Sequence, residues 1–493
     1  MTRYHHLITD ENRKWWTLGA MCFALFMIML DNTVVNVALP SIQKDLGASI
    51  SGLEWTTSGY TLSFAVILAT GGRLGDIFGR RLVFLIGVVI FALSSATAGL
   101  APDQTALVVS RVVQGIGAGL MMPGTLSIIT DAFPPHERGK AMGTWAGVSA
   151  LALAIGPVLG GLLTEHVSWR AIFYLNVPVA IGAVTATLFA VRESRDTSVG
   201  KEVDYLGVAT LTTGLTALIL ALVEGNSWGW GSAPIVALLV GSIVGLAAFV
   251  FVEQRVKAPI VQFELLSNRN FLGASIVALI ITFAMMGVFF FLALYMQNIL
   301  GYSPLEAGVR FLPSTLMIVA VAPIAGRLAD RFGPRWLMVG GLTLLTASLL
   351  SFTQIAVDST YADLLLGFVL LGIGIAMTMS PMTSAAMNAV PVQKAGVASG
   401  VLSMFRMIGG SLGVAVTGAI FQSAVGADFA SATPQEFVDA LATAMGVSAA
   451  VVALGVVVAA VVIRTSRKPG EVPLEVAEAE ASPGGELLAG RTG

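Results

Sequence analysis

Long apolar runs separated by short polar connections fill almost the whole chain. A run of roughly 20 apolar residues is long enough to cross a bilayer as an α-helix. We predict fourteen such spans, at 15–40, 52–72, 81–100, 104–130, 139–163, 169–190, 204–223, 232–253, 271–298, 306–329, 335–354, 361–389, 395–421 and 437–463. The pattern therefore predicts an all-α integral membrane protein with 14 transmembrane helices.

The composition supports this assignment. Charged residues make up 11% of the chain, against roughly 25% in a typical soluble domain, while apolar residues make up 56% and the mean hydropathy is +0.84. The net charge of −2 argues against a nucleic-acid partner, and the single cysteine, Cys22, excludes an internal disulfide. The first apolar run exceeds the roughly 7–15 residues of a signal-peptide core, so we expect it to remain as a span.

The basic residues are distributed unevenly between the two sets of connections. Most of the 27 lysines and arginines lie in one set, and only Lys44 and Arg170 lie in the other, while Arg111, Arg310 and Arg406 fall inside spans. Loops rich in Lys and Arg stay in the cytoplasm. We therefore predict a multi-pass protein of the cell membrane with both termini cytoplasmic.

A short charged sequence occurs twice, about half a chain apart. GRLGDIFGRR at 72–81 and GRLADRFGPR at 326–335 share Gly, Arg, Leu, Asp, Phe and Gly in register, and they follow the second and tenth spans. A second echo pairs the GIG of 115–117 with the GIG of 372–374, in the fourth and twelfth spans. Internal repeats are common in transporters, so we predict that spans 1–6 match spans 9–14.

This repeat divides the chain into four parts. We predict a six-helix bundle at 1–203, two inserted transmembrane helices at 204–253, and an interfacial linker with a second six-helix bundle at 254–463. Residues 464–493 are rich in Glu, Gly, Pro and Ala without an apolar period, which predicts a disordered cytoplasmic tail.

The charged sequence itself is interpreted as a gating turn. Gly75 and Gly79 would allow a tight reversal of the chain. Asp76 could pair with Arg80, or accept backbone N–H groups at the start of a neighbouring helix, and so hold two bundles together. The alternative is a plain cytoplasmic anchor, which would not require the acid. The candidate gating residues are Gly72, Arg73, Gly75, Asp76, Gly79, Arg80, Asp330 and Gly333.

Asp31 is the only acid that we place well inside a span. A carboxylate there costs at least roughly 2.5–3.5 kcal/mol, so it should face a bundle interior or a wet cavity. Burial favours the neutral form of a carboxyl, whereas a nearby cation favours the charged form. A group under both influences can bind and release a proton, although a structural ion pair is the alternative.

Arg111 is the predicted partner of Asp31. At about 1.5 Å per residue, the two side chains lie at similar depths in the first and fourth spans, so contact requires only that these spans be neighbours. Gln114 lies three residues on, on the same helix face. Alternatively, Arg111 could extend to the membrane surface.

Three further polar residues inside spans are candidates for substrate binding together with Gln114. Asn32 and Asn36 flank the Asp31 face, and Arg406 lies near the middle of the thirteenth span. Arg406 could hold an anionic substrate group or bond to backbone carbonyls of a neighbouring helix. Arg310 lies close to a span end, where we expect it to extend to the membrane surface.

The fifth span combines a proline with closely spaced glycines. Proline bends a helix, and glycines four residues apart let another helix approach closely. Both features predict a kinked helix at a tight interface. The residues of this motif are Gly147, Gly156, Pro157, Gly160 and Gly161, with Gly143 forming a second GxxxG pair.

Common enzyme signatures are missing from the sequence. There is no GxxxxGK[ST] loop for nucleotide hydrolysis and no HExxH zinc motif. We therefore expect no catalytic residues, no metal and no cofactor, with the proton as the only coupling ion.

Taken together, these motifs resemble the major facilitator superfamily, and specifically its fourteen-span drug:proton antiporter family. The matching segments are 30–40, 72–81, 111–115, 147–161 and 169–178, which follow one another in the family's order. The resemblance implies the major facilitator fold, with two six-helix bundles and two extra helices. It also implies that a proton enters as a drug leaves by alternating access. Asp31 and Arg111 would then couple protons, and Asp76 with Arg80 would gate.

The leading functional hypothesis is a multidrug efflux transporter that exports drugs or amphipathic secondary metabolites in exchange for protons. The alternatives are a dedicated exporter of one metabolite or peptide and, with less support, a transport-inactive sensor or scaffold. We find no acid well inside spans 9–14, which disfavours strongly cationic substrates. The expected partners are small amphipathic molecules, protons and the lipid bilayer, and we expect the monomer to be functional.

Overall fold

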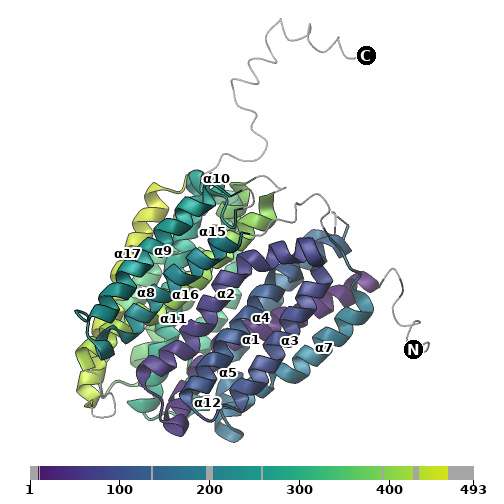
Figure 1. Ribbon diagram of the computed structural model, residues 1–493. Coiled ribbons are helices and arrows are strands. Elements are labelled where there is room, and N and C mark those ends of the chain that lie inside the picture. The colour runs from purple at the N-terminus through teal and green to yellow at the C-terminus, as the bar shows by residue number, and fades with distance from the viewer. Residues whose placement is uncertain are drawn as a thin grey trace, which may run out of the picture.

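The computed structural model describes residues 9, 12–134, 137–195, 204–256, 259–390, 394–425 and 432–464. The predicted disordered tail lies outside these ranges, apart from its first residue. Every regular element in the described ranges is a helix, and the helices lie side by side in two groups (Figure 1).

The helices confirm the predicted span count. Thirteen are long and apolar enough to cross a membrane, and α2, which bends by 47° between its two segments, brings the number to fourteen. Two predicted spans are each built from a pair of consecutive helices, α6 with α7 and α12 with α13. The helices of the first group are α1 (Arg13–Leu46), α2 (Ile50–Phe78), α3 (Arg80–Gly99), α4 (Gln104–Ala132), α5 (Arg138–His166), α6 (Ala171–Tyr174) and α7 (Asn176–Ala190).

The remaining helices comprise a connecting pair and the second group. The pair is α8 (Tyr205–Trp228) and α9 (Ala233–Glu253). The second group contains α10 (Phe263–Ser267), α11 (Arg269–Asn298), α12 (Pro304–Arg310), α13 (Leu312–Phe332), α14 (Pro334–Phe352), α15 (Tyr361–Asn388), α16 (Ala395–Val425) and α17 (Pro434–Val461). The exact boundaries of the four predicted parts remain predictions, and so does the interfacial position of the linker.

The two ends of the molecule differ in charge. We call the end that carries Arg13, Arg81, Arg192 and Arg335 the basic end. The other end, which holds the loops at 47–49, 100–103, 167–170 and 299–303, is called the distal end. Several distal helix starts are capped by side chains, as where Ser303 and Glu306 form a capping box at α12, because the first backbone N–H groups of a helix need acceptors.

The repeated charged sequence is mostly helix, which corrects one prediction. Helix α2 continues to Phe78, so Gly75 is helical and does not form a reversal. The turn consists of Gly79 alone, with φ 123°, and Gly333 with φ 84° occupies the same place between α13 and α14. A positive φ favours glycine because a Cβ would strain the backbone. Hydropathy predicted the end of the apolar run, whereas the helix extends past it.

The two GIG sequences pack in the same way, which supports the predicted duplication. In each, the first glycine touches the span two before it: a Cβ on Gly115 would collide with the carbonyl of Tyr60 in α2, and one on Gly372 with that of Ser314 in α13. The second glycine touches the intervening span. A Cβ on Gly117 would lie 2.8 Å from the carbonyl of Gly87 in α3, and the α15 counterpart lies at the same distance from its α14 partner.

The apolar core is divided unevenly between the ends. One large cluster takes in the distal half of α1, from Leu30 to Ile42, together with α11, α15 and α16 of the second group. A smaller cluster belongs almost wholly to the first group and contains the α1 residues from Leu18 to Ile28. Met29 packs against both clusters. The two groups of helices therefore share a core towards the distal end, while the first group has a core of its own towards the basic end.

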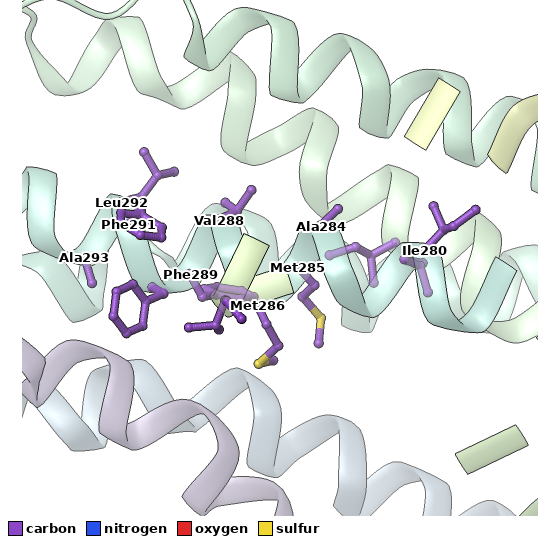
Figure 2. Packing of buried hydrophobic residues seen from close by; sticks show 14 of the residues in the cluster. Ile280, Ala284, Met285, Met286, Val288, Phe289, Phe291, Leu292 and Ala293 are labelled. Carbon is purple, nitrogen blue, oxygen red and sulfur yellow. The ribbon is translucent and has the colours of Figure 1, made fainter. Parts of the chain in front are cut away.

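Helix α11 is the most buried span. Its residues from Ile280 to Met296 are almost all buried, and their side chains point towards helices on several sides (Figure 2). Met285, Met286 and Phe289 belong to this packed core. A helix that is apolar on every face is expected at such a central position.

Candidate functional site

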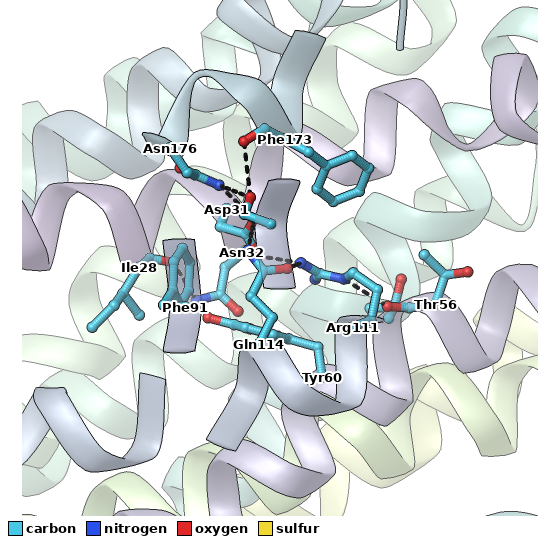
Figure 3. Close-up of polar contacts among 12 residues, drawn as sticks. Ile28, Asp31, Asn32, Thr56, Tyr60, Phe91, Arg111, Gln114, Phe173 and Asn176 are labelled. Atoms are coloured by element: carbon cyan, nitrogen blue, oxygen red, sulfur yellow. Dashed lines mark hydrogen bonds and ion pairs between the residues drawn. The ribbon is translucent and has the colours of Figure 1, made fainter. Parts of the chain in front are cut away.

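The structure places Asp31 of α1 in direct contact with Arg111 of α4, inside the first group of helices (Figure 3). Arg111 Nη1 lies 2.5 Å from Asp31 Oδ2, and both side chains are about 1% exposed. Asp31 lies close to Met29, where the two apolar clusters meet. The pair is therefore a buried salt bridge at the boundary between the two cores.

Two amides complete the coordination of the carboxylate. Gln114 Nε2 donates to Asp31 Oδ1 at 3.0 Å, while its own Oε1 accepts from Arg111 Nη1 at 2.7 Å. Asn176 Nδ2, from α7, donates to the same Oδ1 at 3.2 Å and to Ser95 Oγ of α3 at 3.0 Å. The cluster thus joins α1, α3, α4 and α7 (Figure 3).

Asn176 was not predicted as a site residue. It lies in WRAIFYLNVP at 169–178, a segment recognised only as resembling a family motif. The signal was a polar amide within an apolar span, but no spacing rule connects it to Asp31. Its role became visible only when the folded chain placed α7 beside α1.

Arg111 makes three further contacts. Its Nε donates to the backbone carbonyl of Thr56 in α2 at 3.0 Å. Its guanidinium lies over the ring of Tyr60 at 4.2 Å and near that of Phe173 at 5.7 Å, and such cation–π contacts stabilise a desolvated cation. Removing one partner of a buried ion pair leaves an uncompensated charge and typically costs about 3–5 kcal/mol.

Among the described residues, Asn32 and Asn36 bond only to their own helix. Asn32 Nδ2 donates to the carbonyl of Ile28 at 2.9 Å, and Asn36 Nδ2 donates to the carbonyl of Asn32 at 3.3 Å. Neither side chain forms a hydrogen bond with the Asp31 cluster. Their predicted role in substrate binding stays a prediction.

Arg406 bonds to a side chain of the neighbouring helix α15, whereas the two predicted alternatives were an anionic substrate group and backbone carbonyls. Its Nη2 donates to Thr383 Oγ1 of α15 at 2.8 Å, and its Nε has no hydrogen-bond partner within the described ranges. Arg310 lies near the distal end, where its guanidinium covers the ring of Tyr302 at 3.7 Å. Whether Arg406 binds substrate stays a prediction.

The predicted pair of Asp76 and Arg80 forms, and it includes a third residue. Arg80 Nε lies 2.9 Å from Asp76 Oδ1, and Arg80 Nη1 lies 2.7 Å from Asp131 Oδ2 of α4. Asp131 was not predicted, because it ends an apolar span and reads as an ordinary helix terminus. All three residues belong to the first group, so this triad ties α2, α3 and α4 to one another.

The other predicted gating residues are less informative. Gly72 lies against Pro123 of α4, and Arg73 is half-buried on α2. Gly79 approaches the carboxylate of Glu193 so closely that a Cβ would lie 2.6 Å from it. Asp330 lies in α13, but its side chain is outside the described part of the structure.

The glycines of α5 fall into two classes. A Cβ on Gly156 would collide with Thr33 of α1, and one on Gly160 would lie 2.6 Å from the carbonyl of Val34. A Cβ on Gly161 would collide with the carbonyl of Pro304 in α12, across the boundary between the two groups. These glycines confirm the predicted close approach.

The second glycine pair of α5 does not make the predicted close approach to another helix. Gly143 and Gly147 lie towards the basic end, and a Cβ on either would meet nothing within 4 Å in the described part of the chain. The predicted close packing at this pair is therefore wrong for this arrangement. Sequence spacing cannot distinguish a glycine in contact from one that faces open space.

Four hydrogen bonds between the two groups lie in the distal half of the helices. Gln297 Nε2 donates to the carbonyl of Val37, and the backbone N–H of Leu305 donates to Glu165. The other two join α2 to α16: Ser411 Oγ donates to the carbonyl of Ser58, and Gln422 Nε2 donates to Glu54. The shared core and the packed glycines of α5 are on the same side of the molecule.

Glu54 is a second buried acid that the sequence analysis missed. It is 0% exposed in α2, although the prediction named Asp31 as the only acid well inside a span. Because Glu54 is near the start of its span, hydropathy alone places it at the membrane surface. Among the described residues, no group of three His, Cys, Asp or Glu side chains could hold a metal ion.

These features define the class of protein. Two repeated bundles of six spans, joined at one end, with a buried charge pair inside the first of them, form the architecture of a secondary transporter. The Major Facilitator Superfamily matches residues 21–414, and the chain belongs to this family. Its similar proteins are transport proteins, not enzymes.

Two relatives and one solved structure place the chain more closely. It is 38% identical over 416 residues to the tetracenomycin C resistance and export protein of Streptomyces glaucescens, covering 84% of this chain and 77% of that protein. It is also 38% identical over 422 residues to a puromycin resistance protein of Streptomyces alboniger, covering 85% and 84%. A bacterial homologue of the lysosomal transporter Spinster, solved inward-facing and occupied, shares the fold with a TM-score of 0.64 and 18% identity, covering 92% of this chain and 98% of that one.

Proposed function

We propose that this protein is a proton-coupled exporter of antibiotics or other amphipathic small molecules. The observation that carries the proposal is the buried Asp31 carboxylate, which is held by Arg111, Gln114 and Asn176. A charge in that position is costly, and titratable groups within spans commonly mark proton pathways. Similarity to named resistance and export proteins supports the export direction.

In the proposed cycle, protonation of Asp31 changes the network around it. The charged carboxylate accepts hydrogen bonds on both oxygens and neutralises Arg111. A bound proton removes the negative charge and converts one oxygen into a donor. Arg111 then loses its counter-ion, and the contacts that join α1 to α4 and α7 must rearrange. A proton can thereby shift the balance between two arrangements of the bundles.

The contact between the bundles supports alternating access as the transport mechanism. The bundles meet through the distal hydrogen bonds and the glycines Gly161 and Gly308, while Gly143 and Gly147 have open space beside them. With the basic end in the cytoplasm, as the positive-inside rule indicates, this arrangement is closed towards the outside. Both termini are then cytoplasmic, and we propose that the protein acts as a monomer in the cell membrane.

A dedicated exporter of a single metabolite is the second candidate. The specific observation in its favour is that both relatives carry the name of one compound, tetracenomycin C or puromycin. Comparing efflux of several unrelated amphipathic drugs with efflux of one polyketide would separate the two candidates, because only a multidrug exporter lowers accumulation of all of them.

The test of the proposal is drug efflux by Asp31→Asn in a host that lacks its own pumps. Asparagine keeps the size of the side chain but cannot carry a proton, so we expect loss of at least about 90% of protonophore-sensitive efflux, equivalent to about 1.4 kcal/mol or more. Asp45→Asn is the matched control, because Asp45 is an exposed acid on the same helix that pairs with Arg170.

Membrane levels of both variants should equal those of the unaltered protein on quantitative blots. Normal efflux by Asp31→Asn would defeat the assigned role of Asp31. Efflux by the unaltered protein that continues in the presence of a protonophore would defeat proton coupling itself.

A further inference from the structure

Glu54 lies at the contact between α2 and α16, in the distal half of the molecule. Its carboxyl is 0% exposed, and its Oε1 accepts a hydrogen bond from Gln422 Nε2 at 2.8 Å. Helix α16 approaches so closely that a Cβ on Gly418 would collide with the same oxygen. The acid belongs to one bundle, and its only hydrogen-bond donor in the described ranges belongs to the other.

The second oxygen of Glu54 has no hydrogen-bond partner among the described residues. A buried carboxylate normally needs several donors or a cation, since burial without them favours the neutral acid. Asp31 has three donor side chains, one of them cationic, whereas Glu54 has one neutral amide. The surroundings of Glu54 therefore suit a protonated carboxylic acid.

The charged and titratable groups around Glu54 also favour its neutral form. From α8, the carboxylate of Glu224 accepts from Trp55 Nε1 at 3.2 Å and is close enough to interact electrostatically with Glu54. From α4, Arg111 reaches the carbonyl of Thr56, but its charge is paired with Asp31 of α1. Helix α16 presents the neutral amide of Gln422. Of these charged groups, Glu224 acts on Glu54 by repulsion between two acids, which also favours a neutral Glu54.

The seam between α2 and α16 has few hydrogen bonds across it and several buried polar groups without a partner in the described structure. On the α2 side, the hydroxyls of Thr57 and Ser58 have no hydrogen-bond partner in the described structure. One hydrogen bond other than that of Glu54 crosses the seam, from Ser411 Oγ to the carbonyl of Ser58 at a long 3.3 Å. Parting the seam would expose these groups to water and satisfy them.

We propose that Glu54 is a pH-sensitive residue of this contact, which keeps its proton while α2 and α16 are in contact and releases it to the distal side when they separate there. Separation lets water reach the carboxyl, which then ionises and resists return to the closed seam. High external pH therefore favours the separated arrangement, and low pH favours the closed one. The use of this step in export rests on the proposed function, but the pH-dependent contact does not.

The test measures the distance across the distal end, without any substrate. Spin labels are placed on Leu100→Cys and Gln354→Cys, two exposed distal positions on different bundles, in a Cys22→Ser background. The full-length protein is held in lipid nanodiscs, and distance distributions are recorded by pulsed electron resonance between about pH 5 and about pH 9, a range that lies above the usual pKa of a carboxyl group.

In the otherwise unaltered protein we expect the long-distance population to grow as the pH rises. Release of one proton on opening can change the ratio of open to closed forms by up to about tenfold per pH unit. Glu54→Gln should lose most of this opening, because the amide cannot ionise; a small response that remains would belong to Asp31. Glu54→Asp should restore a pH-dependent opening, which separates a titrating role from a merely structural one.

Two results would overturn the proposal. One is an unaltered pH response in Glu54→Gln, and the other is a distance distribution in the unaltered protein that does not respond to pH. If Glu54→Gln does not fold, Glu54→Asp still decides the question, because a pH-independent distribution in that variant contradicts a titrating acid. A failure of drug efflux would leave these distances unchanged, so the two proposals fail separately.

Discussion

The two halves of α5 differ in their neighbours although they carry similar glycine spacings. Towards the distal end, Gly156 and Gly160 press against α1, and Gly161 presses against α12 of the other bundle. Towards the basic end, Gly143 and Gly147 face open space within the described structure. A glycine in a helix interior costs about 1 kcal/mol relative to alanine. At the distal end, close packing explains why glycine is used despite this cost. At the basic end, nothing in the described structure explains it.

The apolar cores show the same contrast. The distal half of α1 lies in a core shared by both bundles, while its basic half lies in the core of the first bundle alone. A shared core resists separation, whereas separate cores permit it. The difference places the tighter contact between the bundles at the distal end, as the proposed alternating access requires. Under the proposed cycle, Gly143 and Gly147 serve the opposite arrangement.

The largest expected effect comes from filling the packed end. Gly161→Leu places a side chain where even a Cβ would collide with the backbone of Pro304, so the distal contact cannot form. We expect loss of nearly all efflux and a marked fall in the thermal unfolding temperature, since overpacking typically costs about 1–3 kcal/mol or more. Gly182→Leu is the control, because Gly182 of α7 is exposed with nothing within 4 Å in the described chain. Near-normal efflux by Gly161→Leu would contradict the closed distal contact.

Adding a side chain at the basic end of α5 by Gly147→Leu should lower transport without lowering stability. A Cβ on Gly147 would meet no neighbour within 4 Å among the described residues, and leucine is a better helix former than glycine by roughly 0.8 kcal/mol. The unfolding temperature should therefore stay the same or rise slightly. Efflux should nevertheless fall severalfold if this half of α5 packs during the cycle. Full efflux with an unchanged unfolding temperature would show that the basic half never closes on α5.

The smallest effect is expected from an exposed ion pair at the basic end. Lys394 bonds to Glu264 of α10 at 2.6 Å, and this contact lowers the pKa of Glu264 below its usual 4.5. A carboxyl with a lowered folded-state pKa contributes stability above its unfolded pKa and loses it as the pH falls through the folded value. Lys394→Gln should therefore lower the unfolding temperature slightly at neutral pH and not at all below about pH 3. A large effect at neutral pH would assign this end a tighter contact than its exposure suggests.

Much of the fold was predictable because the bilayer demands it. Apolar length marks every span, and the repeat of GRLGDIFGRR marks the duplication. The contact of Asp31 with Arg111 followed from equal depth and the high cost of a lone charge. These arguments depend on how deep a residue lies in the membrane. The number of residues between it and the end of its span measures that depth well.

The sequence analysis missed residues whose contacts depend on the direction in which they point around the helix axis. Glu54, Asn176 and Asp131 each lie where hydropathy is uninformative, at a span end or among other motif residues. Gly75 was misread as a turn because polarity was taken as the end of a helix, whereas α2 continues beyond its apolar run. Which face meets which neighbour is decided by packing between distant segments, and no single-sequence pattern reports it.

The position of α8 has a consequence for how a polar seam survives in lipid. Glu224 of α8 accepts from Trp55 of α2, and Asn226 of α8 donates to the carbonyl of Ala419 in α16 at 2.7 Å. Helix α8 therefore contacts both bundles beside Glu54 and covers the line where they meet. If the bundles part there, α8 can remain bonded to only one of them. The inserted pair would then move together with a single bundle.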